Sequence, residues 1–156
     1  MLCPGAEYGP AKCWPASHYA ELASYFIQGG WEVALLGSEK DRKTTNEISN
    51  QVNHLNCHNL AGKTSLHEAI LLLALAKHVV SNDSGLMHIA AAVGSSVIAI
   101  YGSSDPKFTP PLSSKSSLAH LDFACSPCFK RECPLGHLDC LNNIEAKQII
   151  RMIGKT

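Results

Sequence analysis

The segment from Pro4 to Pro15 contains residues that could bind an anion. Gly5 and Gly9 allow a ligand to come close to the backbone, and Lys12 offers a positive charge just before an expected helix. This combination suits a diphosphate, but an ordinary turn with a solvated lysine fits the residues about equally well. The glycine spacing matches neither the dinucleotide-binding fingerprint nor a Walker A loop.

A second segment with suitable chemistry joins a short apolar run to a helical one. Asp83, Ser84 and Gly85 come at the expected start of that helix, where free backbone N–H groups attract anions. His88 lies about one turn further on and could donate to a phosphate oxygen. The alternative is structural, with Asp83 as the N-cap and His88 packed against a neighbouring helix. We favour the binding interpretation because three suitable groups converge there.

Two further loops are less specific. Glu39, after an apolar run, could accept hydrogen bonds from a ribose, although an acid-rich helix start explains residues 37–41 better. The segment Gly102–Thr109 could form a rigid pocket wall or an ordinary proline-containing loop.

Four cysteines gather in a segment of weak periodicity, within residues 120–141. One pair has the Cys-x2-Cys spacing typical of zinc sites, so a structural zinc ion is a candidate, with a redox-sensitive loop or unligated thiols as alternatives. Lys130, Arg131 and His137 also make this loop basic, as a cover for an anionic substrate would be. The candidate metal ligands are Cys125, Cys128, Cys133 and Cys140.

The elements that must position these loops alternate between strand and helix. This alternation predicts an α/β fold with three layers, in which a parallel sheet is covered on both faces and ligands bind beyond the carboxyl ends of the strands. We expect strands at Met1–Cys3, Glu32–Leu36, Cys57–Leu60, His78–Ser81 and Val97–Tyr101. We expect helices at Ser17–Gln28, Asp41–Gln51, Ser84–Val93 and Ile144–Ile153. A further helix should run to about Ala76 from a cap at Thr64 or Ser65, since Glu68 has the capping-box spacing from Ser65.

Composition limits the class of protein. The 156 residues have a formal net charge of zero, so a basic nucleic-acid interface is not expected and residues 1–156 should form one domain. No apolar run is long enough to cross a bilayer; the best candidate, Ala69–Ala76, is interpreted as a buried helix. The first residues lack the pattern of a signal peptide, which favours a cytoplasmic protein with cysteines as thiols or metal ligands.

Two long motifs resemble a known family. They are PGAEYGPAKCWP followed by HYAEL, and NDSGLMHIAAA followed by VIAIYGSSDPKFTPPLS, within a match from Pro4 to about Ser113. The segment is similar to the C-terminal, ADP-heptose-binding domain of the lipopolysaccharide heptosyltransferases of glycosyltransferase family 9, and the first motif favours type II. The Cys-rich loop resembles one that some members carry.

The resemblance implies the donor-binding half of a GT-B glycosyltransferase with two facing Rossmann-like domains. It implies inverting transfer of heptose from ADP-L-glycero-D-manno-heptose to the lipid A–core acceptor of lipopolysaccharide, with no cofactor required for catalysis. The acceptor site and the general base would belong to an N-terminal domain outside this chain. The chain alone should therefore bind the donor without transferring sugar, and the complete enzyme should act at the cytosolic face of the inner membrane.

The resemblance also implies residue roles. Lys12 would face the diphosphate, Glu39 the adenosine ribose, and Met87 would lie beside the nucleotide. Asp83, Ser84, Gly85 and His88 would lie along the nucleotide sugar. Cys13 stands where some relatives have a basic residue, which leaves the charge at that position open.

Two other functions remain open on the sequence. One is a different GT-B enzyme, such as a sugar-nucleotide epimerase, although those usually have a second glycine and a glutamate where this chain has Leu86, Met87 and His88. The other is a non-catalytic nucleotide-binding module left from a split gene.

Overall fold

The computed structural model describes residues 1–154 and contains one sheet of six parallel strands. The strand order is β3-β2-β1-β4-β5-β6. The strands are β1 (Leu2–Cys3), β2 (Val33–Leu35), β3 (Cys57–Asn59), β4 (His78–Asn82), β5 (Ser96–Ile100) and β6 (Ser116–Ala119). The helices are α1 (Ala16–Gln28), α2 (Arg42–Val52), α3 (Leu66–Leu75), α4 (Gly85–Ala92), α5 (Asp139–Asn142) and α6 (Ala146–Ile153), with 3-10 turns η1 (Pro10–Lys12) and η2 (Glu39–Asp41).

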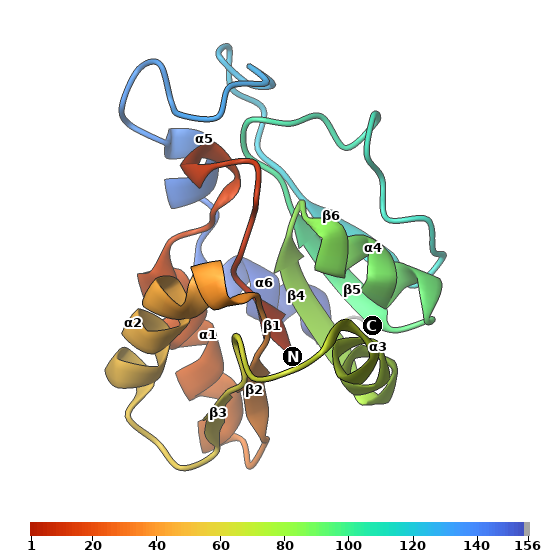
Figure 1. The fold of residues 1–156 in the computed structure, drawn as a ribbon. Helices are drawn as coiled ribbons and strands as arrows, with labels where there is room; N and C mark the ends of the chain where they lie inside the picture. Colours follow the sequence, from red (N-terminus) through yellow and green to blue (C-terminus); the bar gives the residue numbers. More distant parts are fainter. Residues whose placement is uncertain (155–156) are drawn as a thin grey trace.

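Helices cover the sheet on both sides (Figure 1), with α1, α2 and α6 on one face and α3 and α4 on the other. Side chains alternate between the two faces along each strand, so Ile98 and Ile100 pack with the first group while Val97 and Ala99 pack with the second. Because both faces are buried at the centre of the sheet, β5 carries apolar residues at nearly every position. The predicted three-layer α/β fold with a parallel sheet is confirmed.

Helix α3 begins as the sequence predicts. The Ser65 hydroxyl accepts from the backbone N–H of Glu68 at 3.3 Å, and the Glu68 carboxylate accepts from the backbone N–H of Ser65 at 2.8 Å. This capping box satisfies two N–H groups that a helix start otherwise leaves unpaired. However, Leu71 and Leu75 of this helix are 50% and 84% exposed, so the prediction that Ala69–Ala76 is a buried helix is wrong. Helix α3 lies in an outer layer and buries only the stripe that faces the sheet.

The sequence patterns do not predict three short elements, namely β6, α5 and η1. Strand β6 extends the sheet beside β5, with Ile98 paired to Ser117 and Ile100 to Ala119. It lies at the edge of the sheet and carries a largely polar sequence, so it lacks the apolar run that predicts a strand. No helix among residues 1–154 is long and apolar enough to span a membrane.

The strand order reverses between β1 and β4. Chain connections leave β1 toward β2 on one side and β4 toward β5 on the other, which opens a crevice beyond the carboxyl ends of these two strands. The loop after β1 contains Lys12, and the loop after β4 begins with Asp83. The fold therefore brings together the two segments whose chemistry is most suggestive.

Candidate functional site

Lys12 and Asp83 meet across this crevice. The Lys12 Nζ lies 2.5 Å from the Asp83 Oδ2, and the two side chains are only 15% and 4% exposed. The same carboxylate oxygen accepts from the Ser104 hydroxyl at 2.6 Å and from the Thr109 hydroxyl at 3.4 Å. Asp83 is therefore not the N-cap of α4. The structural alternative, which made it the N-cap, is wrong. Its carboxylate holds Lys12 in place through charge and hydrogen bonding in a mostly dry setting.

Asn82, the last residue of β4, is a positioning residue that the sequence reasoning missed. Its Oδ1 accepts from the Trp14 backbone N–H at 3.0 Å and from the Tyr19 hydroxyl at 3.1 Å, and its Nδ2 donates to the Pro4 carbonyl at 2.6 Å. These contacts fix both ends of the loop that carries Lys12. The available signal was a polar amide directly after a buried apolar strand, since a buried amide needs partners.

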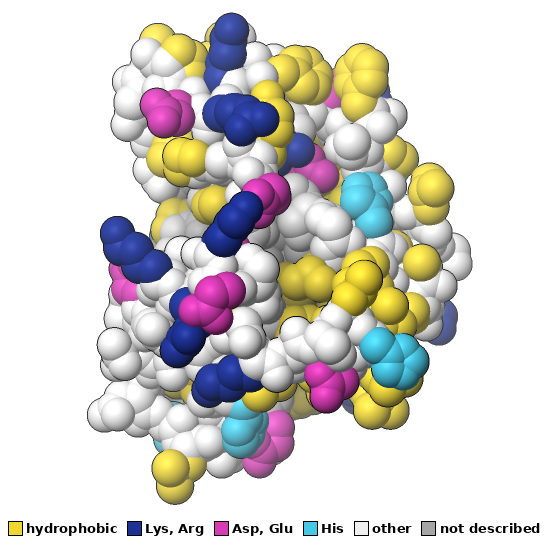
Figure 2. All heavy atoms as spheres, viewed as in Figure 1, with side chains coloured by type: hydrophobic (Ala, Val, Ile, Leu, Met, Phe, Trp, Pro, Cys, Tyr) yellow, Lys and Arg dark blue, Asp and Glu magenta, His cyan; other side chains and the backbone are white. Residues whose placement is uncertain are grey.

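A pocket of about 370 Å³ opens beside the ion pair, and we refer to it as the strand-end pocket. In Figure 2 the surface facing the viewer is hollowed between the side formed by η2 and α2 and the side formed by α3 and α4. The starts of α3 and α4 both line this pocket, so their unpaired N–H groups favour an anion there. Its lining residues are Gly5, Ala6, Glu7, Leu36, Gly37, Ser38, Asp41, Thr64, Ser65, Leu66, Ala69, Ser84, Gly85, Leu86 and Ile89.

The start of α4 is open toward this pocket. Ser84 is the N-cap residue, but its side chain does not cap the helix; its hydroxyl lies 3.2 Å from that of Ser81. A Cβ built on Gly85 would have no atom within 4 Å. Space over the first turn of α4 is therefore free for a ligand, and the neighbouring protein atoms do not require a glycine at position 85.

Glu39 lies at the edge of this region rather than in it. Its side chain is 68% exposed and its Oε1 accepts from Arg42 Nη1 at 2.8 Å. The Asp41 carboxylate accepts from the Ser38 backbone N–H at 2.7 Å, which forms an acidic capping box at η2. The structural alternative for residues 37–41, an acid-rich helix start, is thus confirmed. A contact between Glu39 and a ribose stays a prediction.

Met87 and His88 do not line the strand-end pocket. Met87 is fully buried in the core on the α4 side, where its sulfur accepts from the Tyr101 hydroxyl at 3.4 Å. His88 is exposed on α4. The roles that the family resemblance implies for these two residues stay predictions.

A second, aromatic pocket of about 480 Å³ lies on the other side of Lys12. The Lys12 ammonium and the Arg131 guanidinium lie 5.0 and 5.1 Å from the centre of the Tyr8 ring, which is within the range of cation–π attraction. Lys12 lines this aromatic pocket but not the strand-end pocket. The lining residues of the aromatic pocket are Tyr8, Lys12, Ser104, Asp105, Phe108, Thr109 and Phe129.

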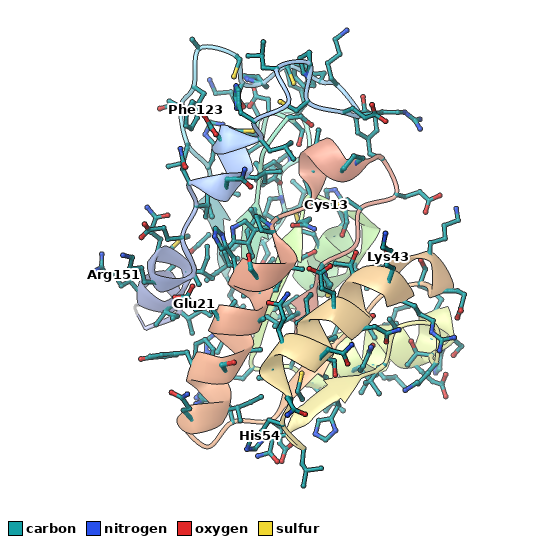
Figure 3. The ribbon with its side chains drawn as sticks, turned by 90° about the vertical axis from the view of Figure 1, so that its left-hand side faces the viewer. Cys13, Glu21, Lys43, His54, Phe123 and Arg151 are labelled. Atoms are coloured by element: carbon teal, nitrogen blue, oxygen red, sulfur yellow. The ribbon has the colours of Figure 1, made fainter. Side chains whose placement is uncertain are left out.

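Cys13 contributes no positive charge to the crevice. It follows η1 directly, and Figure 3 shows it at the approach to α1. Burial, and then the nearby Asp41 carboxylate, raise the pKa of its thiol, so the group is neutral at pH 7. Lys12 is accordingly the basic residue that this loop brings to Asp83.

The Cys-rich loop lies next to η1 (Figure 1). Cys125, Cys128, Cys133 and Cys140 are free thiols that line one small cavity of about 20 Å³. Among residues 1–154, His, Cys, Asp and Glu side chains nowhere form a ready group of three or more metal ligands. A metal ion at these thiols therefore stays a prediction.

Comparison with known proteins identifies the family of this chain. The family model described as glycosyltransferase family 9 (heptosyltransferase) matches residues 1–139. Lipopolysaccharide heptosyltransferase 2 of Escherichia coli K12 is 45% identical over 156 residues, which cover 98% of this chain and 45% of that protein. The chain thus spans about half the length of this relative.

Solved structures share the fold. The structure of E. coli ADP-heptose lps heptosyltransferase II superposes with a TM-score of 0.85 at 42% identity, covering 99% of this chain and 44% of that one. The E. coli heptosyltransferase WaaC with ADP, at 23% identity and a TM-score of 0.76, shows the same fold over 99% of this chain and 43% of its own. Sequence and fold together lead to one conclusion: this chain belongs to glycosyltransferase family 9, the heptosyltransferase family.

Proposed function

We propose that this chain is the donor-binding half of an inverting heptosyltransferase that uses ADP-L-glycero-D-manno-heptose to build the inner core of lipopolysaccharide. The observation that carries the proposal is the Lys12–Asp83 ion pair at the switch point of the sheet, beside the open start of α4. A relative of known structure is named for ADP-heptose, which supports the same class of donor.

In this proposal the strand-end pocket takes the nucleotide. The diphosphate would lie over the first turn of α4, which has no side-chain cap, and Lys12 would have to extend from its ion pair with Asp83 to reach it. Glu39, at the rim, would have to leave Arg42 to reach the ribose. The aromatic pocket on the other side of Lys12 is then available to the sugar.

These residues suit the transfer step. Cleavage of the bond between the anomeric carbon and the phosphate oxygen leaves negative charge on ADP, and fixed N–H groups and Lys12 stabilise that charge as it forms. The Asp83 carboxylate is already engaged by Lys12 and Ser104, so we do not assign it as the general base. We therefore assign the base, and the lipid A–core acceptor, to an N-terminal domain outside this chain. No cofactor enters this scheme, and the complete enzyme would act at the cytosolic face of the inner membrane.

Calorimetric titration with ADP, with UDP and GDP as controls, tests the proposal. We expect selective binding of ADP and a loss of roughly 10- to 100-fold in affinity in Lys12→Ala, because a charge-assisted hydrogen bond contributes about 1.5–3 kcal/mol. Lys43→Ala, which removes an exposed lysine of α2 (Figure 3), should bind ADP normally. Tighter binding of UDP, or no binding by the folded chain, would contradict the proposal.

A further inference from the structure

The Cys-rich loop has a side-chain arrangement that donor binding does not use. Cys125, Cys128 and Cys133 come from the loop and Cys140 from α5, and all four line the same cavity of about 20 Å³. A space of this size is suited to a single water-sized occupant. The remaining cysteines, Cys3, Cys13 and Cys57, lie outside this cavity.

The backbone turns sharply directly after Cys133. Gly136 adopts a φ of 75° and its N–H donates to the Cys133 carbonyl at 3.1 Å, which closes a tight turn. This turn brings Cys133, Pro134, Leu135 and His137 into the lining of the same cavity.

All four thiols border the same small cavity, and each is a free cysteine. His137 also lines the cavity, but its Nδ1 already accepts from the Asp139 backbone N–H at 3.0 Å.

We propose that Cys125, Cys128, Cys133 and Cys140 bind one thiophilic metal ion, Zn²⁺ or iron, as a tetrathiolate structural site. Soft sulfur ligands in tetrahedral arrangement select these metals. Binding forms four metal–sulfur bonds and releases the protons that the thiols carried. Because the sulfurs of residues 1–154 do not already surround a common point at bonding distance, the metal draws them inward by rotation of the side chains into the cavity.

Such a site would limit the movement of the loop that carries Lys12. The Ala11 backbone N–H donates to the Arg131 carbonyl at 3.0 Å, and the Tyr8 hydroxyl donates to the Phe129 carbonyl at 2.8 Å. Both acceptors lie between Cys128 and Cys133 in sequence. A metal bound by Cys128 and Cys133 would therefore restrict the movement of the two carbonyl groups that bind the Lys12 loop, without itself contacting the donor.

Cobalt titration of the full chain, reduced and freed of metal, tests the site directly. We expect one equivalent of Co²⁺ to bind, with the sulfur-to-cobalt charge-transfer and intense d–d absorption of a tetrahedral thiolate site, and one equivalent of Zn²⁺ to displace it. Elemental analysis of the protein as purified distinguishes zinc from iron. Far less than one equivalent of bound metal, or cobalt spectra without charge-transfer bands, would overturn the proposal, whatever the chain does with ADP.

Variants add a second criterion. Cys128→Ser and Cys133→Ser should abolish the tetrathiolate spectrum, whereas Cys13→Ser, a half-buried thiol outside the cavity, should retain it. In the unsubstituted chain, Zn²⁺ should raise the melting temperature, which does not depend on any variant folding. Retention of the full cobalt spectrum in both cavity variants would refute the assignment.

Discussion

Two adjacent residues at the end of β4 have separate tasks. Asn82 ties the loop after β1 to the sheet through its amide, while Asp83 directs its carboxylate to Lys12. Adjacent residues of a strand point to opposite sides, which lets one serve the core and the other the crevice. A binding site thus depends on a residue that need not touch the ligand.

Asn82→Ala should destabilise the chain and weaken ADP binding. The change leaves the Trp14 N–H, the Tyr19 hydroxyl and the Pro4 carbonyl without their partner, and an unsatisfied buried group costs about 1–3 kcal/mol. We expect a loss of about 2–4 kcal/mol in the free energy of unfolding, measured by urea denaturation. The exposed Asn50→Ala should change it by less than about 0.5 kcal/mol. Equal effects of the two substitutions would show that the amide does not hold the loop.

At the scale of elements, periodicity and caps predict most of the sheet and its helices. Helix α1 is predicted one residue short of its observed start at Ala16, and the capping box of α3 follows from the spacing of Ser65 and Glu68. Helix α5 has only four residues and β6 is a polar edge strand, so neither shows the regular spacing of apolar residues that predicts a helix or a strand.

The contacts of the candidate site are harder to predict from sequence than the loops that carry them. Lys12 and Asp83 are 71 residues apart, and the sequence offers Asp83 a role as an N-cap or in binding but does not predict its ion pair with Lys12. Ser104 and Thr109 join the same carboxylate from a loop that composition marks only as proline-containing. Their roles depend on strand order, which brings the ends of β1, β4 and β5 together.

Ser65→Ala should weaken the start of α3 by about 1 kcal/mol, because it removes one half of the capping box. The backbone N–H of Ser65, and then its hydroxyl, lower the pKa of Glu68 in the folded chain. The stabilisation is therefore present above the unfolded-state pKa of Glu68, and it is lost as the pH falls through the folded-state value. Thermal unfolding between pH 7 and pH 3 should show a smaller pH dependence in Glu68→Gln. An unchanged dependence would contradict this account.

At the scale of the whole molecule, two cores on opposite faces of one sheet support a single edge where loops converge. The core on the α1 side contains Trp14 and Tyr19, and the core on the α4 side contains Met87 and Tyr101. The residues on this edge that we assign to the donor all belong to this chain, whereas the base and acceptor are assigned elsewhere. Donor binding should therefore be observable in this chain without any transfer of heptose.

The chain alone should bind ADP-heptose without transferring heptose. Saturation with ADP at 100 times the Kd should stabilise it by about 2.7 kcal/mol, visible as a higher melting temperature. A heptosyl-transfer assay should show product only when the N-terminal half of a family member is added. Turnover by the chain by itself would contradict the assignment of the base to that other half.

The central position of β1 sets the order in which the chain can fold. Leu2 pairs with Leu35 and with Val80, so the strand of this sheet that is synthesised before the other five lies between two partners that come later. At about 5–20 residues per second, the ribosome needs about 4–16 s to reach β4 after making β1. During that interval β1 has one neighbour at most, and the crevice between β1 and β4 cannot yet exist. Nascent chains of this fold should consequently acquire the anion site late, in a step governed by synthesis rather than by local helix formation.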